Sequence, residues 1–386
     1  MDGISNWAAM SLVTSGGNSY NGSSGFKIGA DAADLIWEKA NQVNVGINAE
    51  LFNGRLALSV DGYYQKTSGL LYNISTLATT GYTTRTANIG SLENKGLEVM
   101  VSGKIFDGPF KWELATNLSY TKNKLLSLDG VLDMKINGGG ANTGKVMHAL
   151  MVGKPVSAFY MLRQDGIYQT DQEVPSKLYA KGVRAGDCKY FDYNNDGDIT
   201  DDDRMYVGKV TPDIYGGITS TMNWKNFDLS IFCQFAAGGK ILSAWKGCGG
   251  TEGTEHLGLA SSSIKGYKNG TLVNSEQFYN ISKYAANHYW RGEGTSNTVP
   301  RPTLAGTFTG GFGNNLVSTR YLEDASYFKF KTITLGYSLP HSLLSKIHVT
   351  GARIFVSLDN FFTLTKYSGY DPEFSYESNP TGNSYG

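Results

Sequence analysis

This chain of 386 residues has no excess of either charge, no long apolar run and only three cysteines. Lysine and arginine together number 34, as do aspartate and glutamate, so the sequence indicates no basic surface for nucleic acid. No apolar run of about 18 residues occurs, which excludes a membrane-spanning helix. Cys188, Cys233 and Cys248 are odd in number and far apart, so they predict neither a disulfide framework nor a metal site.

The start of the chain also lacks a targeting signal. Met1 to Ile4 contain no basic region leading into an apolar segment, so no signal peptide is visible. We therefore expect either a cytoplasmic protein or a natural start further upstream. Residues 1–34, rich in glycine, serine and asparagine, are predicted to be a loop-rich lead-in.

Glycine and tyrosine are abundant instead. The chain has 48 glycines and 24 tyrosines against 9 prolines and 6 tryptophans, a composition that favours turn-rich all-β structure. Residues 42–67 show it most clearly, because apolar residues from Val43 to Leu51 alternate with polar ones. Asn53-Gly54 then predicts a tight two-residue turn into a second alternating strand from Leu56. This hairpin is apolar on one side only.

Further hairpins follow, and their connections alternate in length. Short turns are predicted at 107–109, at 224–226 and at Pro340, with a small strand at about 158–168 inside one of the long connections. Consecutive turns of an antiparallel barrel fall at opposite ends, so all the short turns would share one end. A transmembrane barrel has this asymmetry, whereas a soluble sandwich has no reason to keep it. We favour the membrane barrel and keep the soluble sandwich as the alternative.

Five segments, in order, resemble the SusC/RagA family of TonB-dependent outer-membrane transporters of Bacteroidetes. Leu35 to Glu38 resembles its L-x-W-E motif, and Asn88 to Glu98 its N-x-G-x-x-x-N-x-G-x-E block. The other matches are the acidic segment 191–203 followed by Pro212, the T-L-G-Y-x-L-P block at 334–340 and the G-x-D-P-E block at 369–373.

The resemblance implies part of a large antiparallel transmembrane β-barrel with short periplasmic turns and long extracellular loops. The plug domain and closing strand of that family are absent from residues 1–386, so we expect 35–386 to be a C-terminal barrel fragment. We expect about eight strands, where such transporters need roughly 22. Open strand edges cannot be left in lipid, so the fragment alone would not close.

The same resemblance implies outer-membrane import of glycan oligomers, or of peptides, without catalysis. The implied partners are a SusD-like lipoprotein lid, outer-membrane lipid, and TonB acting through the missing N-terminal part. The alternatives from the residues are a soluble extracellular β-protein that binds carbohydrate and a β-sandwich hydrolase. No catalytic motif supports the hydrolase, since the five histidines have no triad spacing and no G-x-S-x-G elbow occurs.

One acidic segment predicts a possible calcium loop, and no cofactor is otherwise required. Its order follows D-x-[DN]-x-[DN]-G with an acid at the twelfth position, which can place several oxygens around one ion. An aspartate stands where the motif has glutamate, and a solvated acidic turn is the alternative. The candidate ligands are Asp192, Asn194, Asp196, Asp198 and Asp203.

Three weaker patterns complete the sequence-based predictions. Residues 139–145 have phosphate-loop spacing, but Val146 stands where serine or threonine is needed, so chance explains the match better. Tyr289, Trp290 and Arg291 could stack on a sugar ring or anchor a loop. Aromatic residues near strand ends predict an interfacial girdle, with core packing as the alternative. These are Tyr63, Tyr64, Trp112, Tyr120, Tyr327 and Tyr337.

Overall fold

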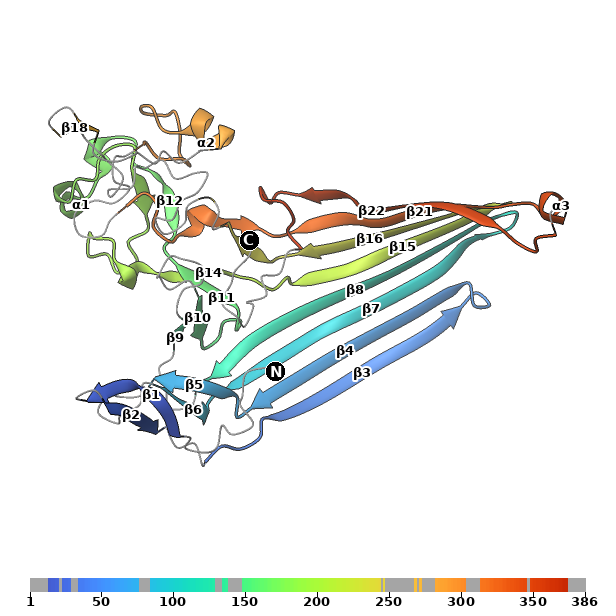
Figure 1. Cartoon of the computed structure of the whole chain (residues 1–386), viewed down its shortest axis with the longest axis horizontal. Coiled ribbons are helices and arrows are strands. Elements are labelled where there is room, and N and C mark those ends of the chain that lie inside the picture. The colour runs from blue at the N-terminus through green and yellow to red at the C-terminus, as the bar shows by residue number, and fades with distance from the viewer. Residues whose placement is uncertain are drawn as a thin grey trace.

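A single eight-stranded antiparallel sheet dominates the structure, a computed structural model (Figure 1). The structure describes residues 13–20, 23–28, 34–75, 84–128, 134–137, 148–243, 246, 267–268, 271–272, 282–302, 313–345 and 348–373. The sheet is a meander in which each strand pairs with its neighbours in the chain. Its strands are β3 (Lys39–Leu51), β4 (Leu56–Ser68), β7 (Ser91–Asp107), β8 (Phe110–Ser127), β15 (Ile214–Trp224), β16 (Phe227–Ala237), β21 (Tyr327–Ser338) and β22 (Arg353–Thr365).

The short and long connections lie at opposite ends of this sheet, as the sequence predicts (Figure 1). We call them the turn end and the loop end. The turn end carries α3 (His341–Leu344). The elements of the loop end are β5 (Leu71–Ser75), β6 (Thr84–Asn88), β9 (Met134–Asn137), β10 (His148–Met151), β11 (Ala158–Met161), β12 (Gln164–Ile167), α1 (Ser176–Ala180), β13 (Cys188–Tyr190), β14 (Met205–Lys209), β17 (Lys240–Leu242), β18 (Tyr267–Lys268), β19 (Thr271–Leu272), α2 (Lys283–His288) and β20 (Leu322–Asp324). None of the helices described here is long and apolar enough to cross a membrane.

Strand pairing aligns the apolar residues into continuous rows on one face. One row pairs Ile47 with Val60, Val60 with Val99 and Val99 with Leu118. It continues beyond Gly216 through Phe235, Phe328 and Leu364. The neighbouring row, one residue along each strand, contains Gly46, Asp61, Glu98 and Ser119, so the opposite face is polar. The sheet thus separates an apolar from a polar environment.

No second layer covers the apolar face over the described ranges, where Val45 and Ile47 are 69% and 68% exposed. A soluble sandwich would bury these side chains against another sheet. The alternative of a soluble β-protein is therefore not supported.

Three predictions of local structure need correction. The first turn is four residues long, from Phe52 to Arg55, because Phe52 joins Asn53 and Gly54 in positive φ. The predicted lead-in loop contains a hairpin of β1 (Val13–Tyr20) with β2 (Ser23–Ile28). The strand predicted near 158–168 is two short strands, β11 and β12, which belong to different sheets.

Candidate functional site

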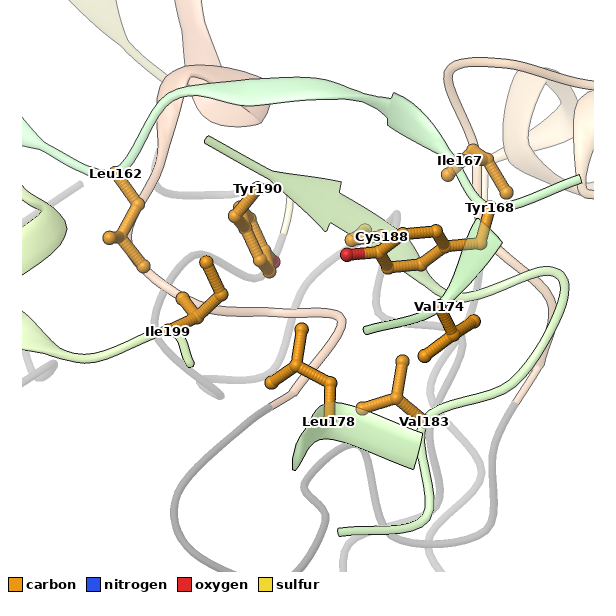
Figure 2. Packing of buried hydrophobic residues seen from close by; sticks show 9 residues of the cluster. All are labelled: Leu162, Ile167, Tyr168, Val174, Leu178, Val183, Cys188, Tyr190 and Ile199. Atoms are coloured by element: carbon orange, nitrogen blue, oxygen red, sulfur yellow. The ribbon is translucent and has the colours of Figure 1, made fainter. Parts of the chain in front are cut away.

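The loop end contains a compact unit with its own core, which we call the loop lobe. It is formed by residues 162–199, 282–302 and 313–321. Its core gathers apolar side chains from β12, β13 and α1 (Figure 2). They are Leu162, Ile167, Tyr168, Val174, Leu178, Val183, Cys188, Tyr190 and Ile199. Burial of these groups supplies the hydrophobic stabilisation that the short elements could not supply alone.

A buried carboxylate joins the three segments of the loop lobe. Asp187 is fully buried and accepts two hydrogen bonds from Arg301, at 2.8 Å from Nε and 3.0 Å from Nη2. The Asn314 side-chain amide and the Arg184 backbone N–H donate to the same carboxylate at 3.0 and 2.9 Å. Each segment of the lobe therefore contributes a donor to one charge.

The adjacent Gly186 allows the side chains of Trp290 and Arg301 to approach the backbone next to Asp187. Its φ is +90°, and a Cβ there would lie 2.4 Å from the Trp290 ring. Only glycine fits both the left-handed conformation and the contact.

The ionisable core groups of the lobe are structural. Burial raises the pKa of Cys188 to about 11 and the pKa of Tyr168 to about 12. Both groups are therefore neutral at neutral pH, and Cys188 offers no thiolate for nucleophilic chemistry.

The predicted calcium loop folds around its own backbone amides. Asp192 accepts from the N–H groups of Asp196 and Gly197 at 3.2 and 2.8 Å. Asp203 is fully buried and caps its turn by accepting from Thr200 N–H at 2.7 Å. Asn194 accepts from Asp196 N–H at 3.0 Å.

Asp198 faces a lysine instead. Both of its carboxylate oxygens lie 2.6 Å from Lys181 Nζ, and this hydrogen bond is the main reason why the pKa of Asp198 is lowered. No group of three or more acidic, histidine or cysteine side chains is arranged to hold a metal in the part of the chain that the structure describes. Calcium binding by the five residues stays a prediction. The glycine-rich segment 139–146 lies outside the described residues.

Trp290 anchors the loop that contains it. Its ring packs against the lobe core, and its Nε1 donates to the Gln169 side chain at 3.2 Å. Arg291 lies over the Tyr289 ring, 4.5 Å from its centroid. The geometry therefore favours the anchoring interpretation of this segment over sugar stacking by Trp290.

The aromatic girdle is only partly as predicted. Trp112, Tyr120, Tyr337 and Tyr64 lie in rows of the apolar face. Tyr63 and Tyr327 lie on the polar face, where their hydroxyls meet Thr121 and Gln234 at 3.3 and 3.2 Å. At the turn end, one row of the apolar face gathers further aromatic side chains, which are Phe110, Trp224, Phe227 and Tyr337.

A charged cluster on the polar face was not predicted. Lys329, only 2% exposed, lies 2.6 Å from Asp371 and 2.7 Å from Glu373, and Lys331 also pairs with Glu373 at 2.6 Å. Burial alone would raise the pKa of Glu373, but its bonds to the two lysines outweigh burial and lower it. The G-x-D-P-E block thus fastens the segment after β22 to β21. Lys329 and Lys331 are two residues apart and therefore lie on the same face of the strand, a spacing in the sequence that could have indicated this cluster.

Other motif residues also have structural roles. Asn88 ties the segment before β3 to the first long connection, since its Nδ2 donates to the carbonyls of Ile36 and Gly69 at 2.7 Å each. Gly96 lies beneath the Tyr63 ring, because a Cβ would come within 2.6 Å of it. Gly336 leaves space for the ion pair between Arg353 and Asp228 across β21.

These features define the class of protein. The sheet is part of the wall of an outer-membrane β-barrel, with an apolar outer face, a polar inner face and a layer of loops that includes the loop lobe. Comparison with known proteins gives the family. Residues 5–231 match the family described as "TonB dependent receptor-like, beta-barrel", and the chain belongs to this family of outer-membrane proteins.

Similar proteins agree with this assignment. TonB-dependent receptor P3 of Formosa agariphila is 30% identical over 89% of this chain and 31% of its own length. TonB-dependent receptor SusC of Bacteroides thetaiotaomicron is 27% identical over 88% of this chain and 30% of its own. The solved RagAB peptide transporter superposes with a TM-score of 0.71 at 25% identity, covering 96% of this chain and 36% of that one. The chain thus spans about a third of the relatives that it matches.

The resemblance to the SusC/RagA family is therefore confirmed, as is the barrel fold with short periplasmic turns and long extracellular loops. The turn end is the periplasmic end and the loop end is the extracellular one. The family is one of receptors and transporters rather than of enzymes.

Proposed function

We propose that this chain forms part of the wall and extracellular loops of a transporter that imports glycan oligomers across the outer membrane. The main support is the two-faced sheet, whose polar face would line an aqueous passage while its apolar face contacts lipid. The edge strands β3 and β22 pair on one side only among the described residues. In lipid these edges would need further strands to close the barrel.

The energy source and partners belong to the same proposal. TonB would act through a plug domain, and a SusD-like lipoprotein would close over the extracellular loop layer. The similarity to SusC supports this partnership. In this scheme the chain binds and guides its substrate and carries out no catalysis.

Peptide import is the second candidate, favoured by the similarity to a protein described as a peptide transporter. Uptake of a fluorescent neutral hexasaccharide and of a hexapeptide by cells that express the complete transporter would distinguish the two. We expect hexasaccharide uptake that disappears when TonB is deleted. Peptide uptake alone would replace the proposed substrate, and no TonB-dependent uptake of any oligomer would contradict the proposed transport.

A further inference from the structure

Five exposed lysines lie on the outer face of the wall, at the loop end of four neighbouring strands. The strands β3, β4, β7 and β8 lie side by side and reach the loop end together (Figure 1). Their outer faces are apolar along most of their length and carry the lysines only near this end. We call this group the lysine patch, and its members are Lys39, Lys66, Lys95, Lys122 and Lys124.

Two rows of the sheet hold most of the lysine patch. In one row Lys95 lies directly opposite Lys122, and like charges in this arrangement are destabilising. In the next row towards the loops, Glu93 lies between Lys66 and Lys124. Over these four strands Glu93 is the one acidic side chain on the outer face, and it forms its ion pair with Lys95 at 2.8 Å. The outer face is therefore strongly positive here.

The lysine patch lies just outside the hydrocarbon layer. From Leu51 to Val43 the outer residues of β3 cover about 27 Å, at roughly 3.4 Å for each residue. A strand tilt of about 40° reduces this to about 21 Å across the membrane, close to the apolar band of about 25 Å in such barrels. Lys39 lies beyond Val43 on the loop side, and Tyr64 and Tyr120 lie at the boundary on neighbouring strands. The lysines are therefore at the level of the lipid headgroups of the outer leaflet.

The lysine patch is confined to one part of the outer face. At the same level on the next two strands, the outer residues are Ile214 of β15, which pairs with Tyr120, and Ala237 of β16. Towards the turn end, the outer rows of β3 and β4 contain Leu51 and Leu56 and no basic residue. Lysines that served only to keep the surface hydrated would not need to gather on four strands at one end. Their grouping favours an anionic ligand.

We propose that the lysine patch binds a phosphate-bearing lipid headgroup in the outer leaflet of the outer membrane. The phosphate would lie between Lys95 and Lys122, where it offsets the repulsion between the two opposed charges. The acyl chains would lie along the apolar band below. The occupant is a lipid because the lysine patch is continuous with the lipid-facing surface. The inference depends on the outer-membrane location and not on which oligomer is transported.

Native mass spectrometry of the complete transporter in detergent tests the lysine patch. The probes are monophosphoryl lipid A, the same lipid after removal of its phosphate, and inorganic phosphate. We expect the phosphorylated lipid to bind on the order of tenfold more tightly than the dephosphorylated one. Equal binding of the two lipids would overturn the proposal. Full displacement of the lipid by an equal concentration of inorganic phosphate would overturn the assignment of a lipid.

A triple variant with a matched control tests which lysines are responsible. Combining Lys95→Gln, Lys122→Gln and Lys124→Gln should abolish the preference for the phosphorylated lipid. The control removes the same charge from three exposed lysines near the turn end and should keep the preference; its changes are Lys104→Gln, Lys111→Gln and Lys225→Gln. An unchanged preference in the first variant, or an equal loss in both, would overturn the lysine patch as the site.

Lys122→Glu tests the site in a variant that should fold at least as well as the original. It replaces the repulsion opposite Lys95 with a pair of opposite charges, so the barrel should resist urea as well as before or better. The preference for the phosphorylated lipid should nevertheless fall on the order of tenfold. A stable Lys122→Glu barrel with an unchanged lipid preference would overturn the proposal. Uptake of oligomers is a separate measurement, so failure of this site leaves the transport proposal standing.

Discussion

Replacing Arg301 with methionine should open the loop lobe while leaving the barrel wall intact. The change removes two charge-assisted hydrogen bonds, of 2.8 and 3.0 Å, and leaves the Asp187 carboxylate fully buried. Loss of one partner from a buried ion pair costs about 3–5 kcal/mol. The donors from Asn314 and Arg184 survive, so we expect the lower limit, about 3 kcal/mol.

Amide hydrogen exchange followed by mass spectrometry measures this local opening. At about 1.4 kcal/mol for each factor of ten, protection of residues 163–190 should fall on the order of 100-fold. Peptides from β7 and β8 report on the wall in the same experiment and should not change. Asp187→Asn should cost less, because Arg301 is 31% exposed and can turn to water once the charge is gone.

Arg291→Met is the matched control in the same loop. Arg291 is exposed, and its contacts are a 3.1 Å bond to the Ala286 carbonyl and the Tyr289 ring. We expect an effect of about 1 kcal/mol or less. Unchanged protection in Arg301→Met, or equal loss in the wall and the lobe, would refute the view that Asp187 joins a separately stabilised unit.

Three further predictions concern the wall and the acidic loop. Val99→Arg on the apolar face should destabilise the membrane-inserted barrel by about 2–4 kcal/mol, measured by urea unfolding. Met100→Arg on the polar face should change the free energy of unfolding little, and equal effects of the two variants would reject the assigned faces. The bond to Lys181 lowers the pKa of Asp198, so the pair stabilises the loop at neutral pH and is lost as pH falls below about 4 through the lowered pKa. Exchange rates of residues 176–203, corrected for the intrinsic effect of pH, should show this loss, and Lys181→Met should weaken the dependence. If calcium binds, added Ca²⁺ should protect residues 192–203 from hydrogen exchange, and EGTA should reverse the protection. No response to Ca²⁺ would reject the calcium site.

The strands of the wall were predictable because their signal is local. Alternation from Val43 to Leu51 and the short turn at 107–109 fix both period and direction within about ten residues. Strand lengths were underestimated, since β7 begins at Ser91, where polar residues occupy both faces. Near the loop end neither face of the strand needs apolar residues. The alternation of apolar and polar residues therefore stops before the strand itself ends.

The loop lobe could not be predicted from such patterns. Its hub joins Asp187 to Arg301 and Asn314, which are 114 and 127 residues away in the chain. Its strands β12 and β13 are only four and three residues long, too short to show a period. The N-terminal hairpin was missed for a different reason: its glycine, serine and asparagine residues are typical of loops, and pairing overrides that preference.

Two separate sources of stability have a consequence for function. The wall is held by its strand ladder and by the environment on each face, while the lobe is held by a buried apolar core and the Asp187 hub. The sequence of the lobe can therefore change while the barrel that crosses the membrane is preserved, as expected of loops on a rigid scaffold.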